Sequence, residues 1–422
     1  MKPAGTLPTT KLQFVDRWLG VPACWLLTQV RRLLGAPPPV DPPRGKLLFV
    51  KLAEQGSTVL AYAAIRRAVQ SVGRENVFFV VFAENRFILD LLDLIPRENV
   101  YAIEAGSFGA LVVSALKTLR RLRAARFEAA VDLEFFARSS AAFTFLSGAR
   151  RRVGFHTFFG EGPYRGDLMT HRLLYNPYLH TSQIFASMVE SLAADPRQLP
   201  TFGAPPPDTD VGESAFRPAA EEVAAVRTIL RRESGGRAED APLVLLNANA
   251  SDLLPLRRWA PERYVDLARR LLDELPDACV LMTGAPAEAE AAERLVALIG
   301  SPRCLSLAGK TSLRQLLVLY TLAEVLVTND SGPAHFASLT PVHVVTLFGP
   351  ETPRLFGART NRNVALYAGV ACSPCVNAYN NRQSPCRNNV CMQLITVDQV
   401  FAAACQAFRG RVRPKVAAAL PG

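Results

Sequence analysis

Short apolar runs alternate with longer amphipathic segments along most of the chain, which predicts buried strands alternating with helices. Alternation of this kind is typical of a parallel sheet with helices on both faces. Strands are expected at 46–52, 77–82, 100–103, 129–133, 243–247, 279–283, 304–307, 324–328 and 342–348, and the most regular helices at 86–94, 108–126 and 221–232. The predicted fold class is therefore α/β, with doubly wound parallel sheets.

Two proline-rich stretches divide this pattern. "GAPPPVDPPRG" at 35–45 precedes the first strand, and "LPTFGAPPPDTD" at 199–210 interrupts the alternation. A chain of 422 residues is longer than one core usually serves, so two domains are expected. The predicted parts are an amphipathic segment and linker at 1–45, a first domain at 46–205, and a second at 206–422 that includes a Cys-rich insert at 372–391 and a C-terminal helix.

The chain carries a formal net charge of +11, which favours anionic partners. No helix-turn-helix, zinc-finger or aromatic RNA-binding signature is present, and the basic residues form only short clusters. Nucleic acid is therefore not expected as a partner. Phosphate-rich substrates and an acidic membrane surface remain.

Residues 12–34, "LQFVDRWLGVPACWLLTQVRRLL", are apolar and aromatic but interrupted by charges and by Pro22. A spanning helix needs about 20 mostly apolar residues, so none is expected here, and the features of a cleavable signal are missing. Trp18, Trp25 and the arginines suit a helix lying in a membrane interface. A helix packed on the protein's own surface would give the same pattern.

The stretch "VTNDSGPAHFASL" at 327–339 reads as a strand followed directly by a helix. Ser331 suits an N-cap and Pro333 the first helical turn. Turns of this kind present backbone amides and the helix dipole to anions, and phosphates commonly bind there. The alternative is that the turn is only a well-capped helix start.

Two other strand ends in the second half carry polar loops. "LLNANASDLLPLRRWAPERY" (245–264) contains Asn249, Ser251 and Arg257, and "LMTGAPAEAEAAERL" (281–295) contains Gly284 and Glu288. Ligands of doubly wound domains lie at the carboxyl ends of strands, so these loops are expected to line one site. Arginine supplies fixed charge to a phosphate. Glu288 suits a ribose diol, or equally an acid at a helix start.

These stretches, together with "LLFVKLAEQGSTVLAYAAIRRAV" near the start, resemble glycosyltransferase family 9, the heptosyltransferase-like enzymes of bacterial envelope assembly. The resemblance spans residues 46–408. It implies a GT-B fold, in which two Rossmann-like domains face each other across a cleft and the second domain holds most of the nucleotide sugar. It also implies inverting transfer without a metal or other catalytic cofactor.

Carried over by motif, the resemblance also assigns the donor site. Asp330, Ser331, Gly332 and His335 would hold the diphosphate and sugar, and Arg257 would replace a phosphate-binding lysine. Glu288 would meet the ribose, while Asn249, Ser251 and Gly284 line the same site. Asp330 and Arg257 would also take part in catalysis.

The first strand-to-helix loop departs from the family pattern. Heptosyltransferases carry a Gly-Asp pair there, whose aspartate is read as the general base, and this chain has Gly56-Ser57. A serine cannot act as that base unaided. Glu54 is the favoured replacement, with Asp132 and Glu134 as alternatives. Otherwise the chain has lost transfer and keeps only ligand binding.

Residues 147–180 are basic, aromatic and rich in histidine, with few helix or strand signals. Long irregular segments in compact domains tend to be functional. Together with Ser57, Arg152 and His156 are therefore candidate contacts to an anionic glycan or glycolipid acceptor. The plainer interpretation is a surface cation and a satisfied histidine.

Four of the eight cysteines cluster late in the chain: Cys372, Cys375, Cys386 and Cys391. The spacing fits a structural zinc or iron site, with disulfides or unligated thiols as rival interpretations. A reducing cytosol disfavours disulfides. Bacterial autotransporter heptosyltransferases, which are similar, carry an iron-bound cysteine finger at a comparable place.

The expected function is transfer of a sugar, with heptose from ADP-heptose as the family default, to an envelope acceptor. The expected location is the cytoplasm, with peripheral contact to the inner membrane. Two alternatives remain: a GT-B module that binds nucleotide sugar without turnover, and a transferase that modifies protein.

Overall fold

The computed structural model describes residues 9–34, 42–199, 207–209, 215–250 and 254–410, with the backbone alone for 9–13 and 34. Ser251 and the domain boundary predicted at 205/206 lie outside these ranges.

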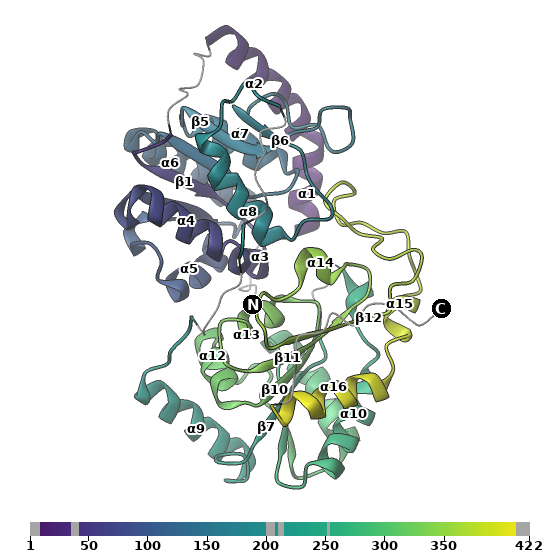
Figure 1. Cartoon of the computed structure of the whole chain (residues 1–422). Helices are drawn as coiled ribbons and strands as arrows, with labels where there is room; N and C mark the ends of the chain where they lie inside the picture. Colours follow the sequence, from purple (N-terminus) through teal and green to yellow (C-terminus); the bar gives the residue numbers. More distant parts are fainter. Residues whose placement is uncertain (1–8, 35–41, 200–206, 210–214, 251–253, 411–422) are drawn as a thin grey trace. The chain divides into compact units, whose positions relative to one another are not determined.

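The chain forms two compact units, each described by itself. The first unit comprises Lys2–Thr209 together with a short loop from much later in the chain, Asn377–Arg382. The second unit comprises Asp210–Val376 and Gln383–Gly422, with Met1. Figure 1 shows the order of the elements along the chain.

In the described part of the first unit, six parallel strands form a sheet in the order β3-β2-β1-β4-β5-β6. The strands are β1 (Leu47–Val50), β2 (Val77–Phe82), β3 (Val100–Ile103), β4 (Ala129–Asp132), β5 (Arg151–Phe155) and β6 (His171–Leu173). The helices are α1 (Thr9–Trp18), α2 (Gly20–Leu34), α3 (Gln55–Leu60), α4 (Tyr62–Val72), α5 (Arg86–Leu92), α6 (Phe108–Ala125), α7 (Arg138–Leu146) and α8 (Thr181–Glu190).

The described part of the second unit repeats this plan, with six parallel strands in the order β12-β11-β10-β7-β8-β9. The strands are β7 (Leu243–Asn247), β8 (Cys279–Met282), β9 (Cys304–Ser306), β10 (Val325–Asn329), β11 (His343–Phe348) and β12 (Asn363–Tyr367). The helices are α9 (Ala220–Ser234), α10 (Pro261–Glu274), α11 (Ala289–Ile299), α12 (Leu313–Leu322), α13 (Gly332–Ala337), α14 (Pro353–Phe356), α15 (Val390–Gln393) and α16 (Val397–Phe408).

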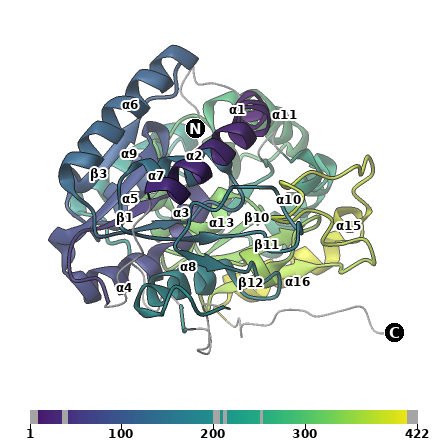
Figure 2. The same ribbon diagram turned by 90° about the horizontal axis from the view of Figure 1, so that it is seen from above.

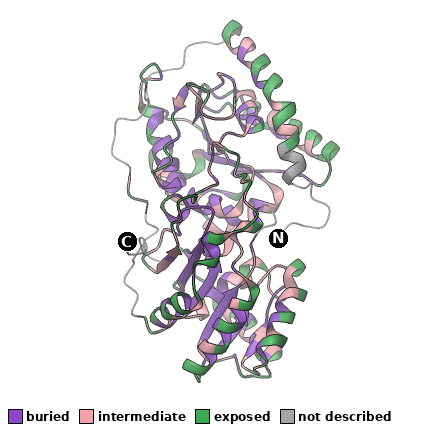
Figure 3. Cartoon of the chain, turned by 90° about the vertical axis from the view of Figure 1, so that its right-hand side faces the viewer, coloured by how far each residue is buried: buried purple, intermediate pink, exposed green. Residues whose placement is uncertain are grey.

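The central strands are mostly apolar, with polar residues at the carboxyl ends of β4 and β7, because helices cover both faces of each sheet. Every residue of β1, β4, β7 and β8 is buried, and Figure 3 shows the strands in purple. The α/β, doubly wound prediction is therefore confirmed. Within the described ranges, no helix combines the length and apolarity needed to cross a membrane.

Three strands were not predicted. β5 and β6 lie within 147–180, so the expectation of an irregular segment there is wrong in part. β5 contains Arg151, which is buried because it pairs with Glu128, and β6 begins with the buried His171. β12, like β6, is an edge strand with partly exposed positions. Polar and half-buried residues hide such strands from a search for apolar runs.

Both sheets have the strand order 3-2-1-4-5-6 when counted from their own first strand. The order reverses between β1 and β4 in the first unit, and between β7 and β10 in the second. Doubly wound proteins bind ligands beyond the carboxyl ends of the strands at such a reversal. The loops after β1, β4, β7 and β10 are therefore the places to examine for a site.

Candidate functional site

The loop after β1 is held in place by a carboxylate that follows the neighbouring strand β4. One oxygen of Glu134 accepts hydrogen bonds from the amides of Leu52 (2.8 Å) and Ala53 (2.9 Å). Its other oxygen lies 2.9 Å from Nζ of the fully buried Lys51. A buried charge must be paired, so this ion pair fixes the path of the loop.

Glu54 lies in this loop, directly before α3, with the left-handed backbone angle φ 69°. Non-glycine residues rarely adopt this conformation, and such strain is concentrated at functional sites. The backbone carbonyl of Glu54 accepts hydrogen bonds from the hydroxyls of Ser57 (3.0 Å) and Thr58 (3.2 Å). The Ser57 hydroxyl also donates to the Glu54 carboxylate at 3.2 Å. The Glu54 side chain is still 34% exposed, so its carboxylate is accessible.

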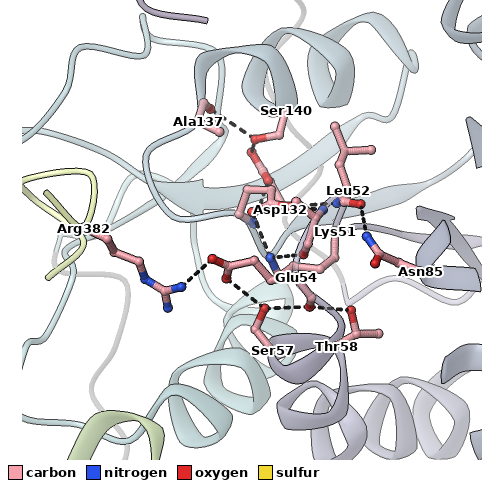
Figure 4. A network of polar contacts seen from close by, with 12 residues as sticks. Lys51, Leu52, Glu54, Ser57, Thr58, Asn85, Asp132, Ala137, Ser140 and Arg382 are labelled. Carbon is pink, nitrogen blue, oxygen red and sulfur yellow. Dashed lines mark hydrogen bonds and ion pairs between the residues drawn. The ribbon is translucent and has the colours of Figure 1, made fainter. Parts of the chain in front are cut away.

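The same carboxylate forms an ion pair with Arg382, which lies in the late loop that belongs to the first unit (Figure 4). The guanidinium also lies over the ring of Phe135, 5.7 Å from its centroid. Tyr379 anchors the loop because its hydroxyl donates to the carbonyl of Tyr175 at 2.9 Å. Arg382 is a residue that the sequence did not single out, since it lies among the cysteines, far from the first loop.

Asp132, the last residue of β4, is completely buried and forms an ion pair with Arg165. The hydroxyl of Ser140 donates to it at 2.9 Å, and the amide of Glu134 at 3.0 Å. Burial raises the pKa of Asp132 to about 6, although Arg165 opposes the shift. Asp132 is enclosed by these partners and Glu134 is only 12% exposed. Of the three carboxylates considered as a base, Glu54 is the accessible one.

The candidate acceptor residues Arg152 and His156 lie on β5 and just after it. Arg152 donates from Nε to the carbonyl of Leu168 (2.8 Å) and from Nη1 to that of Ala149 (2.6 Å), and burial lowers its pKa to about 10. The His156 ring packs edge-on against Phe158, and burial lowers the His156 pKa. These contacts favour structural roles, and an acceptor role for either residue remains a prediction.

The turn between β10 and α13 carries the most specific motif of the chain. Ser331 is the N-cap of α13 and Pro333 lies in its first turn, as predicted. The Ser331 hydroxyl does not accept a hydrogen bond from a helix amide and instead donates to the carbonyl of Asn329 at 3.2 Å. The first-turn amides, at the positive end of the helix dipole, are therefore not capped by this side chain. His335 is buried in the same helix.

Arg257 connects three of the loops that follow strands of the second sheet. It lies in a short 3-10 helix, Pro255–Arg257, in the loop after β7. Its Nη1 donates to the carbonyl of Asp330 at 3.1 Å, and its Nη2 lies 3.2 Å from a carboxylate oxygen of Glu351, after β11. Asp330 also places a carboxylate oxygen 3.8 Å from Nε. Two acids thus orient one cation beside the α13 turn.

The structure also brings together three predicted donor-site residues from the loops after β7 and β8. Gly284 lies against the side chains of Glu288 and Asn249. A Cβ atom added at Gly284 would be 2.9 Å from a Glu288 carboxylate oxygen and 3.2 Å from Nδ2 of Asn249. Glu288 accepts the amide of Ala285 at 2.6 Å, so it caps the start of its own helix, as the simpler interpretation expected. Both Glu288 and Asn249 remain partly exposed, so the cap leaves room for a ligand role.

Asn329, the last residue of β10, holds the β7 loop against the strand. Its Oδ1 accepts hydrogen bonds from the amide of Trp259 (3.1 Å) and the hydroxyl of Tyr264 (3.2 Å). Its Nδ2 donates to the carbonyls of Ala248 and Asn249, each at 3.2 Å. This positioning role was not predicted, and the signal for it was an amide at the end of an apolar run. Glu351 was missed although it too follows a strand.

The proposed metal site is not supported. No group of three or more His, Cys, Asp or Glu side chains in the described ranges is placed to hold a metal ion. Cys372, Cys375, Cys386 and Cys391 all lie in those ranges, and none forms a disulfide. Burial raises the pKa of Cys391, and the other three thiols add to this shift. The four thiols interact electrostatically, but not in a metal-binding arrangement.

The sequence model that represents glycosyltransferase family 9 (heptosyltransferase) matches residues 115–384, so the chain belongs to this family. Lipopolysaccharide heptosyltransferase 2 of Salmonella typhimurium is 34% identical over 102 residues, which cover 24% of this chain. The alignment spans 29% of that relative's length. The sequence similarity to curated relatives thus concerns a limited part of both proteins.

Two solved structures show the same fold over almost their whole length. The E. coli ADP-heptose lps heptosyltransferase II superposes with a TM-score of 0.64 at 18% identity, covering 86% of this chain and 99% of that one. The family 9 glycosyl transferase of Veillonella parvula DSM 2008 gives 0.68 at 16% identity, covering 89% and 100%. The fold prediction, GT-B with two Rossmann-like domains, is confirmed.

Proposed function

We propose that the chain is an inverting glycosyltransferase that moves a sugar from a nucleoside-diphosphate donor to an envelope glycan or glycolipid, without a catalytic metal. The observation that carries this proposal is the position of the candidate residues. Glu54 lies at the reversal of strand order in the first sheet, and Arg257 and the α13 turn lie at the reversal in the second. Ligands of doubly wound domains bind at these reversals.

The donor is assigned to the second unit. Ser331 and Gly332 bring the α13 dipole to the diphosphate, and Arg257 adds a fixed positive charge. A carboxylate repels phosphate, so Asp330 acts by orienting Arg257, from 3.8 Å, and by accepting hydrogen bonds from sugar hydroxyls. His335 supports the same turn from within α13. The ribose would lie against Asn249, Gly284 and Glu288, and Ser251 belongs to the same loop.

ADP-heptose is the proposed donor because a family 9 neighbour in fold is named for it and the curated relatives are named heptosyltransferases. Within the site, Glu288 is the residue proposed to meet the ribose, which every nucleotide donor carries. The base and the sugar are therefore proposed from the relatives, and the binding of a diphosphate from the geometry.

In the proposed reaction, Glu54 accepts the proton of an acceptor hydroxyl as its oxygen attacks the anomeric carbon. The new carbon–oxygen bond forms on the face opposite the diphosphate, so the configuration is inverted and the nucleoside diphosphate leaves with the bonding electrons. Arg257 and the α13 amides stabilise the charge that develops on the leaving group. The charge of Arg257 and the dipoles of the α13 amides take the place that a metal ion holds in other transferases.

The acceptor is assigned to the first unit, beside Glu54. Ser57, which already donates to the Glu54 carboxylate, would contact the acceptor hydroxyl. Arg152 and His156 are the proposed contacts to its anionic groups. The cytoplasm, with peripheral attachment to the inner membrane, is the proposed location.

Turnover tests the proposal directly. The purified chain is incubated with ADP-heptose, in parallel with UDP-, GDP- and dTDP-sugars, and with lipopolysaccharide extracted from a heptose-deficient strain, in the presence of a chelator. We expect nucleoside diphosphate release that depends on acceptor, and a product whose anomeric configuration is inverted by NMR. Binding of a nucleotide sugar without turnover would favour the alternative of a catalytically inactive nucleotide-sugar-binding module. Turnover on protein acceptors alone would mean that the acceptor is a protein and not a glycan or glycolipid.

A further inference from the structure

The first two helices of the chain follow each other with only Leu19 between them, and they pack on the first unit through one face. The amide of Leu19 donates to the carbonyl of Val15 (2.9 Å) and the amide of Ala23 to that of Leu19 (3.2 Å), so α2 continues α1. α1 and α2 lie along α7 (Figure 2). The carboxylate of Asp16 accepts hydrogen bonds from the amides of Ser139 (2.7 Å) and Arg138 (3.2 Å) at the start of α7, where a negative charge is favoured. Thr28, also buried, accepts the amide of Asp167 at 2.9 Å, and Arg31 forms an ion pair with the same residue.

The outward face of these N-terminal helices is apolar. Trp18 is 63% exposed, Trp25 57% and Leu33 82%. On α2, Trp25, Leu26 and Leu33 lie within about 100° of one another around the helix axis, and the buried Cys24 and Thr28 lie outside that arc. The exposed large apolar residues of the N-terminal helices are Phe14, Trp18, Leu19, Val21, Trp25, Leu26 and Leu33.

The inward face of these helices already has its partners. Asp16, Thr28 and Arg31 bond to the first unit, and the buried Cys24 packs in an apolar cluster with Ala141, Leu168 and Met169. A helix on the surface of a water-soluble domain usually has polar residues on its other side. Here that side carries large apolar residues, and contiguous exposed apolar residues of this kind mark an interaction surface.

The charges on the N-terminal helices identify the partner. In residues 9–34 the single acidic residue is Asp16, and its carboxylate is committed to α7. Arg17 and Arg32 are exposed; Arg17 precedes Trp18, and Arg32 follows Trp25 by about two helical turns. We propose that this face, the N-terminal surface, is a docking surface for an anionic lipid bilayer, on which α1 and α2 lie flat with their aromatic residues at the level of the headgroups.

Tryptophan and arginine are the residues that suit this depth. The indole ring is apolar with one polar N–H group, which places it at the boundary between headgroups and acyl chains. Arginine meets lipid phosphates above that level. This inference specifies the surface behind the peripheral location given with the proposed function, and vesicle binding tests it separately from the transfer reaction.

Vesicle binding by the full chain is the test, and tryptophan emission is one readout. The chain has three tryptophans, and Trp259 is buried, so Trp18 and Trp25 report the surface. Vesicles of phosphatidylglycerol and phosphatidylethanolamine should bind the protein and shift its emission to the blue, and brominated acyl chains should quench it. Vesicles of phosphatidylcholine alone should bind it much less.

Two sets of variants separate the apolar and electrostatic contributions. Trp18→Gln with Trp25→Gln should weaken binding to the anionic vesicles by about tenfold or more, because two aromatic side chains no longer leave water. Arg17→Glu with Arg32→Glu should weaken it by about 30-fold at low salt, since each basic residue near an anionic surface contributes on the order of 1 kcal/mol. Leu298→Gln, an exposed apolar residue of α11, is the matched control and should bind like the wild type.

The proposal is overturned if the wild type does not bind anionic vesicles, or if the tryptophan variant binds them equally well. It is also overturned if sedimentation without vesicles shows a dimer that the tryptophan variant abolishes, because the surface would then join two copies of the chain. Quenching by brominated lipid in the wild type needs no substitution and decides the matter if a variant fails to fold.

Discussion

Arg382 forms an ion pair with the carboxylate of Glu54, although 328 positions separate the two residues in the sequence. The pair brings a loop from the second half of the chain to the first strand-to-helix loop, which contains Glu54 and Ser57. Ser57 donates to the same carboxylate at 3.2 Å. Arg382 and Ser57 together therefore hold the proposed base in place.

Glu54→Gln should lower kcat by about 100- to 10,000-fold, because the amide cannot accept the proton of the acceptor hydroxyl. Donor binding should not change, since Glu54 lies in the first unit. Steady-state kinetics with calorimetry of nucleotide binding measures both. Glu98→Gln, an exposed acid in the same unit, should have wild-type activity. Equal losses in both variants would remove Glu54 from the mechanism.

Arg382→Ala should lower kcat by about tenfold, because the Glu54 carboxylate loses the ion pair that positions it for the acceptor hydroxyl. Donor binding, measured by calorimetry, should not change. Arg382→Lys keeps the charge and should keep more of the activity than Arg382→Ala. Arg387→Ala, at an exposed arginine of the same Cys-rich insert, is the control. A kcat in Arg382→Ala equal to that of the wild type would show that the ion pair does not position the base.

Arg257→Ala should weaken ADP binding by about 10- to 100-fold, because a hydrogen bond to a charged group contributes about 1.5–3 kcal/mol. The measurement is isothermal titration calorimetry with ADP. Arg294→Ala removes an exposed arginine of α11 that pairs only with a surface glutamate in its own helix, and should bind normally. If Arg257→Ala binds ADP as tightly as the wild type, the diphosphate does not lie beside this arginine.

The sequence predicted the strands that are mostly apolar, and β2, β3 and β7 have the expected bounds. It could do so because a strand covered on both faces must be apolar. β5 escaped because Arg151 is buried through a partner, and no local pattern shows that pairing. The order of strands, and hence the reversals that select the candidate loops, also depends on contacts between distant segments.

In the candidate site, too, the residues whose roles are local could be predicted, and those that act on distant segments could not. Ser331 and Pro333 could be placed because capping is local chemistry. Glu134 and Arg382 act on residues far along the chain, so their roles could not be read from spacing. For the four late cysteines, spacing predicted too much. It matched a metal site, but the side chains in the described ranges are not placed to form one.

His171 predicts how the stability of the fold depends on pH. It is buried on β6, with Nδ1 3.0 Å from the Thr170 hydroxyl and Nε2 3.2 Å from the carbonyl of Ala194, and burial lowers its pKa below the ordinary 6.5. Below pH 6.5 the unfolded chain takes up a proton that the folded chain does not, so the free energy of unfolding falls as the pH falls.

Denaturant unfolding at about pH 7.5 and about pH 5.5 measures this dependence. His171→Asn should be less stable than the wild type at both values, because it loses buried hydrogen bonds. Between the two pH values, the free energy of unfolding of His171→Asn should fall by less than that of the wild type. An equal loss in the two proteins would show that His171 does not titrate in this way.

The central claim is that the turn at α13 holds a nucleotide, and calorimetric titration of the wild type and of Asp330→Ala with ADP, UDP and GDP tests it most directly. We predict selective binding of ADP by the wild type, and binding weaker by about tenfold or more in Asp330→Ala, because Arg257 loses one of the two carboxylates that orient it. Absence of nucleotide binding, or equal binding in both proteins, would contradict the claim.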